Sequence, residues 1–294
     1  MTTVASRADL AITPLTGTTG AEIRGVDLRG TLPESTVADI LRALVEYKVI
    51  FFPGQHLSTE EHLAFAAQCG EITEAHPISR GNHGHPGLHE INYSEIRETY
   101  AAAPNPYKKP RRDGWHTDVT FMEKPPMGSI LNALAMPERG GDTVFANTEA
   151  AYEGLSGPFR RFLDGLIAVH DGEEAFGEGL RRDGYAEWDG QIIRQFTPVE
   201  HLLVRTHPVS GKKSLFVNPE FTSHILGFSR RESDGILELL YEHMTNQKYL
   251  VRYNWHEGDL GFWDNRSTMH FVVIDYGTQH RLIQRVTLKG ERPF

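Results

Sequence analysis

The chain has 294 residues, a net charge of −9 and an apolar fraction of 39%, values that are ordinary for a globular protein. The acidic balance argues against non-specific nucleic-acid binding, although local basic residues can still hold a small anion. No apolar run approaches the roughly 20 residues of a membrane helix, and residues 1–17 lack the pattern of a secretory signal. The single cysteine, Cys69, excludes an intrachain disulfide. We therefore expect a cytoplasmic protein with no membrane partner.

Two helices and a strand are predicted near the start of the chain. Residues 33–47 carry an apolar stripe at helical spacing. A second helix begins at Ser58, whose capping box is completed by Glu61, and it stops at Gly70. The short apolar run at residues 49–52 predicts a buried strand between the two helices.

Two irregular regions are expected to serve the active site. Residues 73–113 combine prolines, histidines and glycines, which predicts a long loop with one short strand at residues 89–93. Loops of this length within compact domains are often functional. Residues 172–200 are charged and irregular, which predicts an insert or lid.

Strands dominate the remainder of the sequence. They are predicted at residues 117–122, 129–135, 143–147, 202–207, 214–217, 250–255, 258–263, 268–274 and 280–288. Helices are predicted at residues 150–166, broken into two pieces, and at residues 229–244. Because few helical crossovers separate the strands, the pattern favours an antiparallel sandwich or barrel with helices outside, in a single domain spanning residues 1–294.

The triplet His116-Thr117-Asp118 is a candidate for part of a metal site. Fifteen histidines and 39 acidic residues in 294 predict roughly two His-x-Asp/Glu triplets by chance, and one is found, so the triplet alone carries no weight. In a strand, however, residues two apart share a face. A histidine from elsewhere would complete a facial triad of two histidines and one carboxylate, which suits non-haem iron.

His270 is the candidate for that third ligand, because Arg281 and Arg285 follow it on one predicted strand. These arginines are four residues apart and therefore share a face. Inward-facing arginines are costly unless an anion meets them, and the guanidinium fork matches a carboxylate or sulfonate. Pairing with acidic residues of the chain itself is the alternative interpretation.

With these residues in view, the chain resembles the Fe(II)/2-oxoglutarate-dependent dioxygenases of the taurine dioxygenase family. The similarity covers nearly the whole chain. Its segments are WHTDVTF at 115–121, GGDTVFAN at 140–147, VRTHPVSGKKSLFVN at 204–218 and WDNRSTMH at 263–270, in the family's order. The resemblance implies a mainly β, cupin-like fold, a double-stranded β-helix (jelly roll) with flanking helices.

The resemblance also implies a role for each matching position in binding iron and the co-substrate. His116, Asp118 and His270 would hold Fe(II). The far carboxylate of 2-oxoglutarate would pair with Arg281 and accept a hydrogen bond from Thr143. Trp263, the first residue of the WDNRSTMH segment, would form one wall of the co-substrate pocket.

For the substrate, the resemblance implies a site for a small anion and an apolar group. The anionic head would meet Arg285, His76 and the backbone N–H of Val119, while Phe176 and Phe221 would line the apolar part. The expected reaction uses O2 to hydroxylate a C–H bond, with release of succinate and carbon dioxide. A hydroxylated carbon bearing sulfonate or sulfate would then release sulfite or sulfate.

The sequence departs from the taurine enzymes where the ammonium group of taurine would lie. The family has a tyrosine three residues after the head-group histidine and an Asp-Asn pair before the iron motif, whereas this chain has Ser79 and Arg111-Arg112. Cations facing an ammonium would be repulsive. The hypothesis is that Ser79 and Arg112 face a substrate other than taurine: another sulfonate, an alkyl sulfate or an aryloxyalkanoate.

Two other classes of protein remain alternatives. One is a non-catalytic binding protein on the same fold, and the other is a cupin-like metalloenzyme without an oxo-acid, which would leave Arg281 without a role. A homodimer or homotetramer is expected from the resemblance alone.

A few other residues have simpler explanations. His83, His85 and His89 are expected to be solvated, because the glycine and proline between them impose no ligand geometry. Asp264 and Asn265 are expected to shape the turn before His270. Cys69 is expected to be a packed residue at a helix end.

Overall fold

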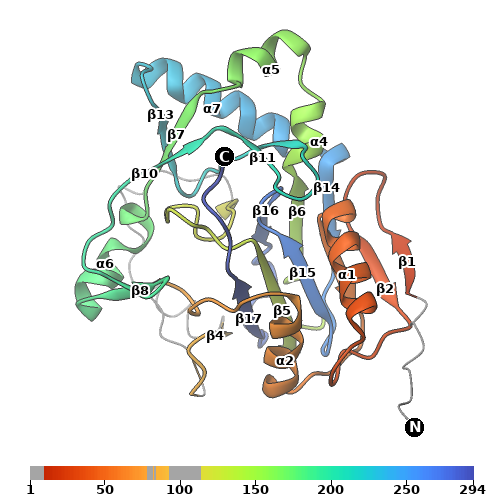
Figure 1. Ribbon diagram of the computed structural model, residues 1–294. Helices are drawn as coiled ribbons and strands as arrows, with labels where there is room; N and C mark the ends of the chain where they lie inside the picture. Colours follow the sequence, from red (N-terminus) through yellow and green to blue (C-terminus); the bar gives the residue numbers. More distant parts are fainter. Residues whose placement is uncertain (1–9, 78–81, 83, 93–113) are drawn as a thin grey trace.

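The computed structural model describes residues 10–77, 82, 84–92 and 114–294. Its centre is a pair of sheets (Figure 1). The larger sheet has the order β1 (Ala11–Pro14), β2 (Ala21–Arg24), β3 (Val49–Phe52), β15 (Leu260–Asp264), β5 (Gly128–Ala135), β17 (Leu282–Leu288) and β4 (Leu88–Asn92). The smaller sheet has the order β14 (Leu250–Tyr253), β6 (Thr143–Asn147) and β16 (Thr268–Val272).

Shorter pairings and the helices complete the fold. A third sheet has the order β10 (Val199–Leu202), β7 (Ile167–His170) and β13 (Thr222–Ile225), and two hairpin pairs are β11 (Val204–Thr206) with β12 (Lys213–Leu215) and β8 (Ala186–Trp188) with β9 (Gln191–Ile193). The helices are α1 (Glu34–Tyr47), α2 (Thr59–Cys69), α4 (Thr148–Glu153), α5 (Gly157–Leu163), α6 (Glu173–Asp183), α7 (Arg230–Met244) and the 3-10 helix η2 (Gln247–Tyr249).

Apolar side chains fill the space between the two central sheets. Phe51 of β3 stacks on Tyr253 of β14 with ring centroids 3.6 Å apart, and Phe145 of β6 meets Phe51 edge-on at 5.8 Å. Leu131 and Ile283 belong to the same buried cluster. Face-to-face packing of two mainly antiparallel sheets is the predicted sandwich architecture.

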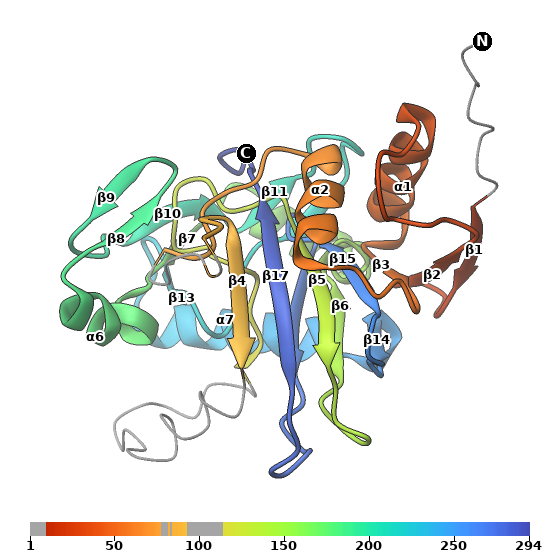
Figure 2. The same cartoon turned by 90° about the horizontal axis from the view of Figure 1, so that it is seen from below.

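Helices cover the outer faces of the sheets. A second buried cluster joins α1 and α2 to the larger sheet, and a third joins α4 and α7 to the smaller one. Figure 2 shows α2 in front of the sheet strands β17 and β5, with α7 behind them. The predicted capping box of Ser58 and Glu61 begins α2, and Ser229 with Glu232 begins α7 in the same way. Within the part of the chain that the structure describes, no helix is long and apolar enough to cross a membrane.

Most predicted elements are confirmed, with three differences. Residues 117–122 form a turn instead of a strand, because Val119 has a φ of 56° and Met122 N–H donates to its carbonyl at 3.1 Å. Residues 172–200 are largely regular: they contain α6, β8, β9 and the first residues of β10. Strands β1, β2, β7 and β13 were not predicted. Each has only four residues, which are too few to show the alternation of apolar and polar residues.

Candidate active site

The structure brings His116, Asp118 and His270 together. The backbones of His116 and His270 form an isolated β-bridge, with N–H donating to carbonyl in both directions at 2.9 and 2.7 Å. The turn that follows His116 carries Asp118 back toward the bridge. One potential ligand atom from each of the three side chains lies within 4.8 Å of the other two, so these side chains could hold one metal ion.

The donor set fits a divalent iron ion. His116 Nδ1 lies 2.8 Å from the carbonyl of Gly114, so Nδ1 carries the proton and Nε2 remains available as a ligand. Burial, together with the nearby His116, lowers the pKa of His270 to about 3, which keeps this imidazole neutral. The buried Nδ1 of His270 has no hydrogen-bond partner among the described residues. Two imidazoles and one carboxylate form the facial triad of non-haem iron sites.

Asp118 is held at both carboxylate oxygens. Oδ1 accepts from Nη1 of Arg285 at 2.7 Å, and Oδ2 accepts from the hydroxyl of Ser129 at 2.6 Å. Burial opposes the ionisation of Asp118, but the Arg285 cation, the two neighbouring histidines and the Ser129 hydrogen bond together outweigh burial and hold the pKa of this carboxyl well below its usual range. Asp118 is therefore a preformed anion.

A chain of hydrogen bonds supports Ser129 from behind. Asn265 donates its side-chain amide to the Ser129 hydroxyl at 2.8 Å, and the indole N–H of Trp263 donates to Asn265 at 3.1 Å. Asn265 was expected only to shape a turn, and Ser129 was not predicted to have a role. No local pattern marks either residue, since β5 places Ser129 opposite Trp263 only in the folded sheet. Asp264 does shape the turn, where its carboxylate pairs with Arg266.

Arg285 contacts Asp118 directly and therefore lies next to the candidate metal site. The ion pair between Arg285 and Asp118 confirms the alternative interpretation, in which an arginine of this strand pairs with an acidic residue of the chain itself. The guanidinium is buried, and its Nε has no hydrogen-bond partner among the described residues. One donor of this buried cation therefore still suits an incoming anion.

His89 occupies the site although a solvated position was expected for it. Its strand β4 pairs with β17 so that His89 lies opposite Arg285, and Nδ1 of His89 is 3.4 Å from Nη2 of Arg285. Its ring centroid is 5.7 Å from that of His76. Burial and the Arg285 charge lower the pKa of His89 to about 3, so the ring is neutral. The expectation for His89 was wrong because the sheet pairing, rather than the surrounding glycines, determines where this ring points.

The residues expected around 2-oxoglutarate come from β15, β6 and the residue just before β17. Trp263 packs against the His270 ring with centroids 4.9 Å apart. The hydroxyl of Thr143 accepts a hydrogen bond from the indole of Trp255 at 2.9 Å, which leaves its own hydrogen to be donated elsewhere. Arg281 is fully buried, and its Nε donates to the carbonyl of Gly141, two residues before Thr143.

An aromatic cluster forms the other side of the site. Phe221 lies 6.2 Å from the His116 ring and 4.8 Å from Phe121, and Phe176 of α6 contacts both Phe121 and His76. The predicted residues His76, Phe176 and Phe221 are therefore close together. Phe121 was missed, because its segment was assigned to a strand rather than to a turn.

Buried polar side chains hold the turn that carries Asp118 and Val119. The hydroxyl of Thr120 lies 2.9 Å from Nδ1 of His170 and accepts from the side-chain amide of Asn218 at 3.0 Å. Asn218 also accepts from the backbone N–H of Phe221 at 2.9 Å, so one amide joins the turn to the aromatic cluster. Such positioning residues carry no signature in a single sequence.

Ser79, Arg111 and Arg112, expected near the substrate, lie outside the described residues, as does His83. His85 is half-buried, and Cys69 is buried as expected.

The sequence matches a known protein family and is similar to known enzymes. The family described as Taurine catabolism dioxygenase TauD, TfdA family matches residues 11–287. An alkylsulfatase of Acinetobacter baylyi is 40% identical over 287 residues, covering 96% of this chain and 86% of the relative. An alpha-ketoglutarate-dependent sulfate ester dioxygenase of Pseudomonas putida is also 40% identical, covering 97% of this chain and 91% of the relative.

A solved structure shows the same fold. The crystal structure of a putative alpha-ketoglutarate-dependent taurine dioxygenase from Burkholderia xenovorans superposes with a TM-score of 0.80 at 38% identity, covering 97% of this chain and 94% of the other. The double-stranded β-helix expected from the sequence is thereby confirmed. The chain belongs to the TauD/TfdA family, and it is an Fe(II)- and 2-oxoglutarate-dependent dioxygenase that uses O2.

Proposed function

We propose that this enzyme hydroxylates a small organic sulfate ester or sulfonate at the carbon that bears the anionic group. The observation that carries the proposal is the position of Arg285, a buried cation whose Nη1 is 2.7 Å from the candidate metal ligand Asp118. An anion held by Arg285 would lie next to the metal, so the carbon attached to that anion would be the one within reach of oxidation. The sulfate ester and alkylsulfatase relatives support the same substrate class.

In this proposal each residue keeps the role that its sequence match implies. His116, Asp118 and His270 hold Fe(II), and Ser129 with Arg285 fixes the orientation of the Asp118 carboxylate. Arg281 pairs with the far carboxylate of 2-oxoglutarate, Thr143 donates its hydroxyl to that carboxylate, and Trp263 closes the pocket behind it. Bound iron and 2-oxoglutarate supply the hydroxylation of a C–H bond by O2, with release of succinate and carbon dioxide.

The substrate head is held by a second group of residues. Arg285 and the neutral His76 face the anion together with the backbone N–H of Val119, while Phe176 and Phe221 exclude water from the reacting carbon. Hydroxylation of a carbon that bears a sulfate ester gives a product whose C–O bond to sulfate breaks. The products are an aldehyde, sulfate and a proton, which solvent accepts.

The chain is proposed to act as one domain over residues 1–294. The 73–113 segment contributes His76 and His89 to the site, and the 172–200 insert contributes Phe176, which is why we regard the first as an active-site loop and the second as a lid. A cytoplasmic location fits the buried free thiol of Cys69, and a homodimer or homotetramer is the proposed assembly.

A panel of substrates tests the proposal. Iron-loaded protein, 2-oxoglutarate and O2 are mixed with alkyl sulfates, alkanesulfonates, taurine and aryloxyalkanoates, and succinate is measured together with sulfate or sulfite. We expect substrate-dependent succinate with a matching amount of sulfate or sulfite, and little turnover of taurine. Robust sulfite release from taurine at low concentration would refute the exclusion of taurine.

An aryloxyalkanoate is the second candidate substrate, because Phe121, Phe176 and Phe221 would suit an aromatic ring as well as an alkyl chain. Phenol release from aryloxyalkanoates, without sulfate or sulfite release from the other compounds, would favour it. Binding of iron and 2-oxoglutarate with no turnover across the whole panel would instead indicate a binding protein.

A further inference from the structure

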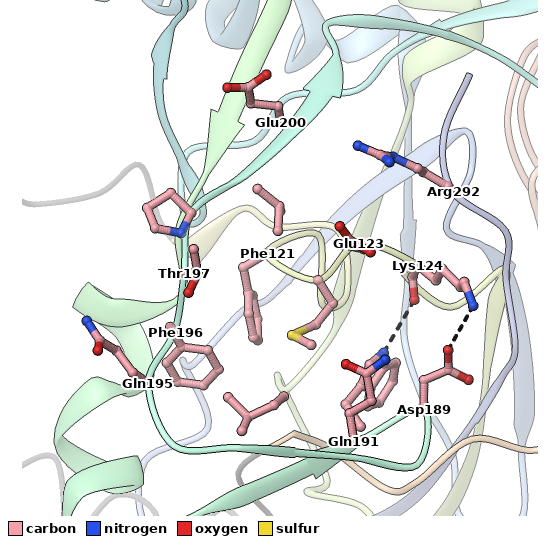
Figure 3. Close-up of a pocket in the computed structure, with 15 residues that line it drawn as sticks. Phe121, Glu123, Lys124, Asp189, Gln191, Gln195, Phe196, Thr197, Glu200 and Arg292 are labelled. Atoms are coloured by element: carbon pink, nitrogen blue, oxygen red, sulfur yellow. Dashed lines mark hydrogen bonds and ion pairs between the residues drawn. The ribbon is translucent and has the colours of Figure 1, made fainter.

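A cavity of about 480 Å³ lies next to the aromatic cluster of the active site (Figure 3). Its apolar lining comes from Phe121, Met122, Trp188, Ile193 and Phe196, and charged side chains occur at its edges. None of the three presumptive iron ligands lines it. Its volume is within the roughly 300–1,000 Å³ of pockets that hold small organic ligands.

The cavity is separated from the substrate site by one apolar cluster. That cluster contains Val119 and Phe221, which are proposed to face the substrate, and also Trp188 and Phe196, which line the cavity. Phe121 belongs to both places: its ring lies 4.8 Å from Phe221 and 5.3 Å from Phe196. The cavity therefore begins two ring contacts away from His116.

The charges at the edge do not form a second anion site. Lys124 and Asp189 form an ion pair at 3.0 Å across one side of the cavity, as the dashed line in Figure 3 shows. Glu123, Glu200 and Arg292 are exposed to solvent. The cavity thus combines an apolar interior with a solvated edge whose three carboxylates outnumber its two cations, which suits a hydrocarbon chain better than an anion.

We propose that this cavity receives the hydrocarbon tail of a linear alkyl sulfate or alkanesulfonate, an inference that rests on the function proposed above. When the anionic head meets Arg285 and the reacting carbon lies at the metal, the rest of the chain must leave the site. The apolar cluster offers that exit, and a rotation of the Phe121 side chain, which is 2% exposed, opens it toward the cavity. The 172–200 insert, which supplies Trp188, Ile193 and Phe196, then selects the length of the chain.

The test compares short and long substrates in matched variants. Each buried methylene is worth about fourfold in affinity, so kcat/KM of the wild-type enzyme should rise from butyl sulfate to octyl sulfate. Ile193→Trp fills the cavity and should lower the octyl-to-butyl ratio of kcat/KM at least about tenfold. Ile192→Trp is the control, because Ile192 is 63% exposed and does not line the cavity, and it should leave the ratio unchanged.

A second variant works in the opposite direction. Phe196→Ala enlarges the cavity and should shift the highest kcat/KM from octyl sulfate toward dodecyl sulfate. Circular dichroism checks that each variant is folded. Anaerobic calorimetric titration of iron- and 2-oxoglutarate-loaded protein with the same sulfates should show the same change in relative affinities. Equal effects of Ile193→Trp on both chain lengths, with no shift in Phe196→Ala, would overturn the tail site while turnover of alkyl sulfates persisted. Absence of turnover by the wild type with every sulfate and sulfonate would instead overturn the proposed function.

Discussion

The two sides of the active site are held together by different kinds of interaction. On the metal side, polar side chains from strands and turns hold one another through hydrogen bonds: Asp118 is bonded to Ser129 and Arg285, and Ser129 to Asn265. On the aromatic side, the side chains of Phe121 and its neighbours make apolar contacts, and more than half of these neighbours come from the 172–200 insert.

This difference indicates which part of the enzyme can change. A buried polar network has a high energetic cost when one member loses its partner, whereas an apolar cluster tolerates substitutions that conserve volume. Substitutions in the 172–200 insert should therefore leave the reaction itself unchanged but alter which substrates the enzyme prefers. Four measurements test this contrast, and they are arranged by the size of the expected effect.

Asp118→Asn removes the charge of the central carboxylate and should have the largest effect. We expect succinate formation to fall at least about a thousandfold and Fe(II) binding to weaken, because the site loses its anionic ligand and Arg285 loses its partner. Metal affinity and succinate release are the measurements. Asp234→Asn, on an exposed face of α7, is the matched control and should behave as wild type. Activity in Asp118→Asn close to that of the wild type would mean that another group binds the metal.

Acid should destabilise the sheet beneath the metal side. Burial lowers the pKa of His62, whose Nε2 lies 3.2 Å from the carbonyl of Ile130, to about 4. The unfolded chain takes up this proton below pH ~6.5, whereas the folded protein resists protonation until pH ~4, so stability is complete above pH ~6.5 and declines as the pH falls. His62 alone should account for about 3 kcal/mol of that loss.

Urea unfolding between pH 7 and pH 4 measures this decline. His62→Gln should make the decline shallower by the share of His62, while His256→Gln, at a side chain that is 77% exposed, should not. A decline in His62→Gln as steep as that of the wild type would contradict the assignment.

Ser129→Ala tests whether the hydrogen bond to Asp118 positions the ligand. We expect Fe(II) affinity to fall about tenfold to a hundredfold, as for other groups that orient a metal ligand. Ser214→Ala is the matched control, since this buried hydroxyl donates to the carbonyl of Arg266 rather than to a ligand. Ser214→Ala should lower stability without lowering metal affinity. Equal metal affinities in the two variants would show that Ser129 is only structural.

Leu180→Met should have the smallest effect and represents the aromatic side. Leu180 of α6 is buried in the apolar cluster without lining the cavity, and the exchange conserves volume. We expect a stability loss below about 1.5 kcal/mol and succinate formation close to that of the wild type. Thermal unfolding and succinate assays measure both. A loss of activity comparable to that of Ser129→Ala would remove the contrast between the two sides.

The sequence predicted most of the fold and the presence of the triad, but not the contacts that support the triad. Helices such as α2 carry their own start and stop residues, and strands such as β3 are continuous apolar runs, so local patterns suffice. The interactions of Ser129, Thr120 and His89 depend on strands that are distant in the chain, and nothing local reports them.

The error at residues 117–122 has a specific cause. Val119 and Phe121 favour a strand by propensity, and tertiary contacts from His201 and Asn218 override that preference. His201 donates its Nε2–H to the carbonyls of both Thr120 and Met122. In a straight strand these two carbonyls would not both point toward His201.

The left-handed backbone of Val119 has a consequence for its side chain. A β-branched residue at a φ of 56° costs roughly 1–3 kcal/mol relative to a residue suited to that conformation. Glycine would relieve the strain, but it would also remove the apolar packing of this 2% exposed side chain, which is worth about 1.5–3 kcal/mol. The same exchange would loosen the amide that is proposed to face the substrate head. The buried valine side chain therefore maintains a backbone conformation that valine by itself would avoid.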